Sequence, residues 1–153
     1  MDSDSDSDSY TAILTEHTDS IYCLKAVGQW LITGSRDRSV RIWRLEPHNE
    51  KGQAGGTELV HTVENAHEGS VLCLELELGQ KGGKGKMVTG SSDMTAGVWE
   101  IDWGTDRFGK GMKVQKVGTL RGHDGGVLDV KLGKGHIITW SVASYCSVSS
   151  LAE

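Results

Sequence analysis

The sequence lacks the features of several protein classes. Its 153 residues include one proline and one phenylalanine, and the other aromatic residues are three tyrosines and five tryptophans. No stretch approaches the run of roughly 18 apolar residues that a membrane-spanning helix needs, so the sequence predicts no such helix. No apolar segment follows Met1, so a secretory signal peptide is not expected either.

Cysteine and positive charge are also scarce. The three cysteines, Cys23, Cys73 and Cys146, cannot all pair with one another and show no Cys-x-x-Cys spacing, which favours a reducing compartment, cytoplasmic or nuclear. The 16 basic residues are outnumbered by 21 acidic ones, and the net charge of −5 disfavours a general nucleic-acid-binding protein. We therefore expect neither a membrane partner nor a specific nucleic-acid partner.

Charge and glycine mark the segments that lie outside regular structure. Residues 2–9 repeat Asp-Ser four times. Alternating carboxylates and hydroxyls bury nothing and repel one another, so we expect a disordered acidic tract over residues 1–10. Residues 46–57, 79–86 and 102–111 combine glycine and charge without an apolar period and are predicted loops.

An internal repeat is the main signal in the sequence. In three copies, a histidine precedes a short alternating apolar segment by four residues, and a second apolar segment with a threonine follows. The copies run from His17 through Ile21 to Thr33, from His67 through Val71 to Thr89, and from His123 through Val127 to Thr139. The apolar residue and the threonine are 12 positions apart in the first and third copies and 18 in the second. The additional residues of the second copy fall in the predicted loop 79–86.

Each copy has the pattern of β-strands. Its apolar residues alternate with period two, are rich in Val, Ile and Leu, and are bounded by Gly and Asp. In residues 40–43, for example, the alternation places Val40 and Ile42 on one face and Arg41 and Trp43 on the other. A period of 50–56 residues built from short strands predicts an all-β chain of propeller blades.

The repeated histidine, the Thr-Gly-Ser-x-Asp sequence and the tryptophan that closes the next strand resemble the WD-repeat family. Gly122-His123 retains the family's Gly-His pair, whereas neither Trp43 nor Trp99 is followed by aspartate. The resemblance covers residues 11–139. It implies antiparallel four-stranded blades over about residues 11–60 and 61–116, a partial blade over 117–139, and a divergent tail over 140–153.

In that family a histidine, a hydroxyl, an aspartate and the tryptophan form a buried hydrogen-bonded set. By resemblance the sets here are His17, Thr33, Asp37, Trp43 and His67, Thr89, Asp93, Trp99. Ser35 and Ser91 are the alternative hydroxyls, because they lie on the same face of the strand. We expect the aspartate to accept a hydrogen bond from the histidine and the hydroxyl to meet the indole N–H, so that no buried polar group is left unpaired.

Arginines cluster around the first turn, at Arg36, Arg38, Arg41 and Arg44. A solvated strand edge with scattered charge is one interpretation. In F-box members of the WD-repeat family, however, arginines beside the turn aspartate bind phosphorylated peptides, and a guanidinium suits a phosphate dianion. Arg36 stands in this position, with Tyr22 at the start of the first strand. The resemblance therefore implies a protein or phosphopeptide partner at Arg36 and Tyr22, and substrate recognition in an F-box ubiquitin ligase, although no F-box is visible in this chain.

No catalytic, cofactor or metal site is predicted. Ser, His and Asp occur together, but the sequence has no Gly-x-Ser-x-Gly, and the repeat makes the same trio twice, which catalysis would not need. Residues 104–110 match the start of a phosphate loop, but Gly111 stands where that motif needs Ser or Thr. Cys23 and Cys73 occupy equivalent strand positions and are expected to be core residues rather than metal ligands. The sequence thus predicts a non-enzymatic protein-interaction scaffold without a cofactor.

The repeat is too short for a closed propeller, which needs about four to eight blades. The chain supplies two blades and the start of a third, and residues 11–14 would be a closing strand without a blade of its own. Ser149 stands where the third copy should have its tryptophan. The sequence therefore predicts an incomplete propeller, with open sheet edges through which copies would self-associate. A truncated propeller fragment without independent activity is the alternative to the scaffold.

Overall fold

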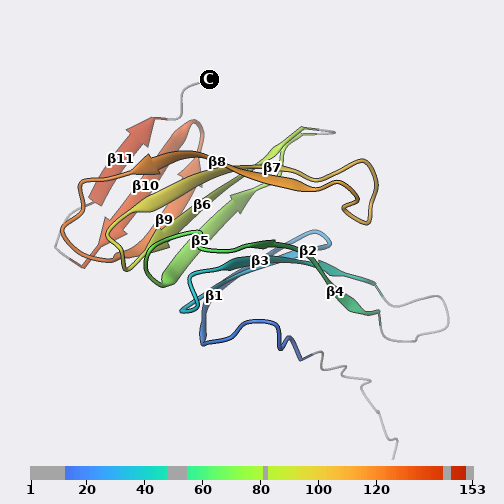
Figure 1. Cartoon of the computed structure of the whole chain (residues 1–153). Helices are drawn as coiled ribbons and strands as arrows, with labels where there is room; N and C mark the ends of the chain where they lie inside the picture. The colour runs from blue at the N-terminus through green and yellow to red at the C-terminus, as the bar shows by residue number, and fades with distance from the viewer. Residues whose placement is uncertain (1–12, 48–54, 81–82, 143–145, 151–153) are drawn as a thin grey trace, which may run out of the picture.

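The computed structural model of the chain describes residues 13–47, 55–80, 83–142 and 146–150. These residues form eleven β-strands in three antiparallel sheets (Figure 1). The described part of the chain contains no helix long and apolar enough to cross a membrane. The predicted acidic tract, residues 1–10, lies outside the described residues.

Each sheet is a meander in which strands that follow one another in the sequence lie side by side. The first sheet contains β1 (Ile21–Val27), β2 (Trp30–Ser35), β3 (Val40–Leu45) and β4 (Thr57–Val63). The second sheet contains β5 (Val71–Glu77), β6 (Gly85–Ser91), β7 (Ala96–Asp102) and β8 (Lys113–Leu120). The third sheet contains β9 (Val127–Gly133), β10 (His136–Ser141) and β11 (Cys146–Ser150). The second sheet lies between the other two (Figure 1).

The three sheets repeat one register, which explains the repeat in the sequence. The repeated threonine of the second strand pairs with an apolar residue of the first strand at Thr33 and Leu24, at Thr89 and Leu74, and at Thr139 and Val130. The turns after β2 and β6 also repeat, because Arg38 and Met94 adopt positive φ angles of 71° and 70° at equivalent positions. One supersecondary unit is therefore built three times from similar local sequence.

The structure differs from the sequence-based expectations at several boundaries. β4 and β8 extend past the expected blade limits at residues 60 and 116 and belong to the first and second sheets. Ile13 and Leu14, the described part of the predicted closing strand, form no strand, and Ile13 is 79% exposed because no sheet edge lies beside it. β6 begins at Gly85, inside the predicted loop 79–86, because Gly85 and Lys86 pair with β7. The divergent tail contributes β11, whose backbone pairs with β10 although its sequence lacks apolar alternation.

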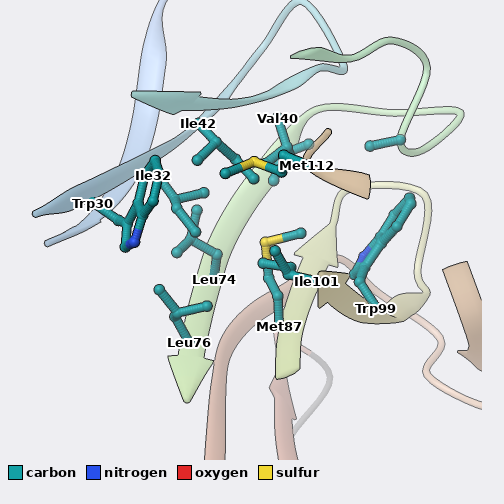
Figure 2. Close-up of a cluster of buried hydrophobic side chains, with 12 residues drawn as sticks. Trp30, Ile32, Val40, Ile42, Leu74, Leu76, Met87, Trp99, Ile101 and Met112 are labelled. Carbon is teal, nitrogen blue, oxygen red and sulfur yellow. The ribbon is translucent and has the colours of Figure 1, made fainter. Parts of the chain in front are cut away.

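Apolar side chains fill the space between neighbouring sheets. Between the first and second sheets, Figure 2 shows Ile32 and Ile42 on one side and Met87 and Ile101 on the other, and all four are fully buried. A second cluster joins the second and third sheets. Its buried members are Cys73, Val88, Ala96, Val98, Val127, Val130 and Ile137. Each fully buried Val, Ile or Met side chain in these clusters contributes roughly 1.5–3 kcal/mol to the stability of the packed sheets.

Glycine allows the first strand of one sheet to approach the second strand of the preceding sheet closely. A Cβ on Gly34 would lie 2.6 Å from Val71 Cγ1, and a Cβ on Gly90 would lie 2.7 Å from Val127 Cγ1 and 3.0 Å from the Val127 carbonyl oxygen. The cysteines that pair with these glycines, Cys23 and Cys73, point their thiols at the carbonyls of the same two valines. The repeated Cys–Gly pair is thus the contact surface between successive sheets.

A charge alternation accompanies this contact. Lys25 Nζ lies 2.8 Å from Glu75 Oε1, and Lys131 Nζ lies 3.6 Å from Glu75 Oε2, so a lysine, a glutamate and a lysine follow one another across the first strands of the three sheets. The long connection between β7 and β8 also contacts the first sheet. Gln29 Nε2 donates a hydrogen bond to the Arg107 carbonyl over 2.8 Å, and the Trp30 ring stacks on the Trp103 ring.

We expect Gly90→Ala to destabilise the protein by about 1–3 kcal/mol, because the added methyl group has to displace Val127 and its backbone. Urea unfolding followed by circular dichroism measures this change. Gly133→Ala is the matched control, since a Cβ at Gly133 would meet nothing within 4 Å. Equal stability of the two variants would show that the sheets do not need this close approach.

Candidate functional site

The first repeated polar set joins the loop before β1 to the turn after β2. Thr33 lies at its centre, because its Oγ1 is 2.7 Å from His17 Nε2 and accepts a hydrogen bond from Trp43 Nε1 over 2.9 Å. The other ring nitrogen, His17 Nδ1, lies 2.8 Å from Asp37 Oδ2. A carboxylate only accepts, so His17 carries its proton on Nδ1 and its Nε2 accepts from the Thr33 hydroxyl. The set therefore selects one tautomer of the histidine.

The aspartate of this set also shapes the turn. Asp37 Oδ1 accepts hydrogen bonds from the Ser39 hydroxyl at 2.6 Å and the Ser39 amide at 2.9 Å, and Oδ2 accepts from the Thr18 amide at 3.1 Å. Burial by itself would raise the pKa of Asp37, but the hydrogen bonds from Ser39, His17 and Thr18 outweigh it and hold the pKa far below the usual range of an aspartate. The carboxylate thus stays charged and fixes the loop, the turn and the strand together.

The second sheet repeats the set with nearly the same distances. His67 Nε2 lies 2.7 Å from Thr89 Oγ1, and Trp99 Nε1 donates to the same oxygen over 2.9 Å. His67 Nδ1 lies 3.0 Å from Asp93 Oδ2, and Thr95 takes the place of the serine by donating to Asp93 Oδ1 over 2.6 Å. This near-identity across two sheets is expected of a structural unit.

The third sheet contains only part of the set. His123 Nε2 lies 2.7 Å from Thr139 Oγ1, as in the other two sheets. The tryptophan is absent, because the residue that pairs with Ile137 is Ser149, whereas Trp43 and Trp99 hold this register position in the first two sheets. At this position the third sheet therefore lacks the buried indole whose N–H donates to the threonine in the other two sets.

The structure assigns different hydrogen-bond partners to the two hydroxyls of each strand that the sequence left as alternatives. Thr33 and Thr89 contact the histidine and the tryptophan. Ser35 instead donates to the Ser20 carbonyl over 2.9 Å and accepts from the Asp37 amide, and Ser91 accepts from the Asp93 amide. The serines therefore hold the turn, and the threonines hold the set.

The histidine rings of the two sets are not accessible to a substrate. The side chains of His17 and His67 are 2% and 0% exposed, and both ring nitrogens of each face a partner within the set. Burial raises the pKa of the Cys23 and Cys73 thiols to about 12, so neither is a nucleophile near neutral pH. Among the described residues, no group of three or more His, Cys, Asp or Glu side chains could hold a metal ion.

The residues predicted to bind a peptide lie at the end of the first sheet that carries the β2–β3 turn. The Arg36 amide donates to the Ser20 carbonyl over 2.9 Å, which brings this turn beside the start of β1, and Tyr22 is 48% exposed there. The Arg36 side chain is 60% exposed, and its nearest charged neighbour is Asp19, at 3.8 Å from Nε to Oδ2. The guanidinium therefore retains donors for a ligand.

Two further arginines of the cluster are not part of an exposed strand edge, whereas Arg38 is exposed at the turn. Arg41 and Arg44 are 8% and 9% exposed. Arg44 Nη2 lies 2.7 Å from Glu46 and 2.6 Å from Glu58, and its guanidinium lies over the Phe108 ring. The interpretation as scattered surface charge is thus wrong for Arg41 and Arg44, because both are buried. Glu46, Glu58 and Phe108 contact the Arg44 guanidinium, and Arg41 Nη2 lies 4.0 Å from Glu64 Oε1.

A polar hollow of about 240 Å³ lies beside the second set and was not predicted from the sequence. Its lining includes His67 and Asp93 of the second set and three polar residues of β8 and the segment that follows it, Lys116, Thr119 and Arg121. Lys116 Nζ donates to the Ala66 carbonyl over 3.2 Å and lies 5.1 Å from the centre of the Trp99 ring. No motif marks these residues, since strand pairing alone brings β8 beside the histidine.

Comparisons with known proteins agree with this geometry. Residues 8–44 match the family described as WD domain, G-beta repeat. The chain is 30% identical over 138 residues to Protein MAK11 of Saccharomyces cerevisiae, 30% identical over 125 residues to Kinesin-like protein KIF21B of Homo sapiens, and 30% identical over 78 residues to Eukaryotic translation initiation factor 3 subunit I of Drosophila melanogaster. The alignments cover 82%, 82% and 51% of this chain, but the chain spans only 28%, 6% and 20% of those relatives.

A solved structure supports the same fold. The crystal structure of the WD40 beta propeller domain of Doa1 superposes with a TM-score of 0.60 at 19% sequence identity. The superposition covers 91% of this chain and 40% of that chain. The predicted all-β, partial-propeller fold is therefore confirmed, and the chain corresponds to less than half of a propeller of this kind.

We expect Thr89→Val to lower the free energy of unfolding by about 1–3 kcal/mol, because it leaves the Trp99 N–H and His67 Nε2 buried without their shared partner. Thr62→Val, the same change on the outer strand β4, is the control and should cost less than about 0.5 kcal/mol. The two variants are compared by urea unfolding. Similar losses would mean that the hydroxyl at position 89 has no special role.

Acid should destabilise the protein in two pH windows. Burial lowers the pKa of His67 more than the Asp93 carboxylate raises it, so the contribution of His67 to stability is complete above about pH 6.5 and declines as the pH falls below that value. Hydrogen bonds that outweigh burial lower the pKa values of Asp37 and Asp93, so their contributions decline only below about pH 4.

Urea unfolding at pH 7.5, 5.5, 4 and 3 measures both windows. Asp93→Asn should reduce the loss below pH 4, because one of the two carboxylates is then absent. Constant stability between pH 7.5 and 5.5 would contradict the role assigned to His67.

Proposed function

We propose that this chain, whose fold is that of part of a WD40 propeller, acts as a non-enzymatic scaffold that binds other proteins. The observation that carries the proposal is that the histidine, hydroxyl, aspartate and tryptophan of each set hydrogen-bond to one another. Their chemistry is used to hold the turns rather than to act on a substrate. One of the similar proteins is, by its name, a subunit of a translation initiation factor, which accords with a role in protein association.

The finer proposal is a phosphopeptide contact at Arg36, with Tyr22 beside it. Two observations support it. Arg36 is largely exposed and only loosely paired with Asp19, whereas its backbone is held by the Ser20 carbonyl. A guanidinium on a fixed backbone can approach a phosphate with two parallel N–H donors, while the exposed Tyr22 ring packs against the peptide.

The F-box ubiquitin ligase version of this function stays a prediction, since it depends on the position of Arg36 beside the turn aspartate, as in the F-box members of the family. None of the similar proteins named above is an F-box protein by its name. A cytoplasmic or nuclear location also stays a prediction. It is favoured by the absence of disulfide bonds among Cys23, Cys73 and Cys146, which all lie among the described residues.

A truncated propeller fragment without independent activity is the second candidate, and the uncovered faces of the outer sheets favour it. Leu24 is 64% exposed on the first sheet, although its equivalents, Leu74 and Val130, are 8% and 1% exposed in the other two sheets. In each of those sheets the preceding sheet covers the residue. A longer propeller would cover Leu24 in the same way.

Charge reversal at Arg36 tests the peptide contact. The full chain is screened against matched phosphorylated and unphosphorylated peptide libraries, and the dissociation constants of bound peptides are measured by fluorescence anisotropy. Arg36→Glu should weaken phosphopeptide binding at least about tenfold, because it replaces a charge-assisted contact by repulsion. Lys113→Glu is the matched control, since Lys113 is exposed at the opposite end of the second sheet.

The possible results separate the two candidates. Selective loss with Arg36→Glu supports the phosphopeptide contact. Equal binding by the two variants contradicts the placement at Arg36. Failure of the wild-type chain to bind any peptide supports the inactive fragment.

A further inference from the structure

The outward face of the third sheet differs from the contact surfaces between the sheets. In the first two sheets, Gly34 and Gly90 pair with Cys23 and Cys73, and the next sheet packs against these pairs. At the same register position the third sheet has Trp140, which pairs with Asp129. The position that elsewhere requires glycine is thus occupied by the largest side chain, and the thiol is replaced by a charged carboxylate.

A further sheet of the same kind cannot pack there in the same way. Even a Cβ on Gly90 would lie 3.0 Å from a backbone oxygen of the next sheet, so an indole would push that sheet away. Close packing would also bury the Asp129 carboxylate with its ion-pair partner Lys131, whose Nζ lies 3.6 Å from Asp129 Oδ1, and burying such a pair costs free energy. The first sheet of a second copy, stacked head to tail, meets the same two obstacles.

The outward face is nevertheless apolar at its centre. Trp140, Ile138 and Val148 are 52%, 41% and 62% exposed there. Directly paired residues of antiparallel strands point to the same face, so the pairing defines two rows across the sheet. One row consists of Asp129, Trp140 and Cys146, and the neighbouring row consists of Lys131, Ile138 and Val148.

We propose that this face binds the same face of a second copy of the chain in a two-fold symmetric dimer. The axis runs across the strands, midway between the two rows, so that each row lies over the other row of the partner copy. Asp129 then meets the lysine that corresponds to Lys131, Trp140 meets the residue that corresponds to Ile138, and Cys146 meets the one that corresponds to Val148. Both halves of such an interface are made by the same residues.

Charge complementarity favours a second copy as the occupant. In each chain Lys131 Nζ lies 3.6 Å from Glu75 Oε2 and 3.6 Å from Asp129 Oδ1, so acidic and basic charges alternate up to the outward face, where the Asp129 and Lys131 side chains are 59% and 62% exposed. The two-fold arrangement places Asp129 of a second copy opposite Lys131, so that the charges of the two faces complement one another. The pairing occurs twice in the dimer. The indole at the centre is a side chain of the type that anchors protein interfaces.

The expected dimer is weak, because three short strands spaced about 4.8 Å apart present less than the roughly 800 Å² per partner of a stable complex. It does not depend on the proposed peptide contact, which lies on the first sheet. Sedimentation equilibrium of the full chain at several concentrations should show association that stops at twice the chain mass. Association that continues to higher masses, or none at all, would overturn the proposal.

Charge exchange tests the symmetry. Asp129→Lys and Lys131→Asp should each weaken the dimer about tenfold, because each variant places like charges opposite one another twice. The double variant restores both pairs and should dimerise like the wild-type chain. Lys113→Asp, on β8, is the control for net charge and should have no effect. A double variant that stays monomeric overturns the proposal, provided that its melting temperature matches that of the wild-type chain.

Trp140→Gly distinguishes the two-fold dimer from head-to-tail stacking. It removes the central anchor of the dimer, so self-association should weaken at least about tenfold. The same change would remove the steric obstacle to stacking by restoring the glycine of the first two sheets, so head-to-tail association would strengthen even though Asp129 remains. Trp140→Ser serves as a second variant that retains a Cβ and should weaken the dimer in the same way. Stronger association of Trp140→Gly would overturn the two-fold arrangement.

Discussion

The short distance between one sheet and the next is the constraint on which the rest of the structure depends. It is set where Val71 lies against Gly34 and where Val127 lies against Gly90, since no side chain larger than a hydrogen atom fits at either glycine. At this spacing the apolar side chains of the facing sheets pack against one another. The third sheet has Trp140 at the position of the two glycines, so its outward face does not offer the same close approach.

The buried polar sets fix the positions of the turns, just as the glycines fix the distance between the sheets. In each of the first two sheets a charged aspartate orients a histidine, the histidine contacts a threonine, and the threonine receives the indole N–H. All of these groups come from different strands or loops, so the set fixes their relative positions. Turn residues such as Arg36 are exposed on a backbone that the set holds still, which is what a binding surface requires.

Much of the fold could be predicted from the sequence because its determinants are local. Alternating apolar residues specify strands, and the repeated Thr-Gly-Ser-x-Asp marks the same hairpin twice. Residues 13 and 14 and the tail depart from this rule for opposite reasons. Leu14 belongs to an apolar pattern but has no sheet edge to pair with, whereas β11 lacks the pattern and pairs through its backbone with β10.

The sequence by itself determined most of the strands, the repeated hairpin and, by resemblance, the histidine, aspartate and tryptophan of the polar sets, because these residues recur in the first two copies. Only the tertiary structure decided which arginines of the first cluster are exposed and which hydroxyl of each strand meets the indole. Arg44 is covered by Phe108, which is distant in the sequence, and Thr33 is selected over Ser35 by the position of His17. Such contacts join segments whose separation in sequence carries no information about their distance in space.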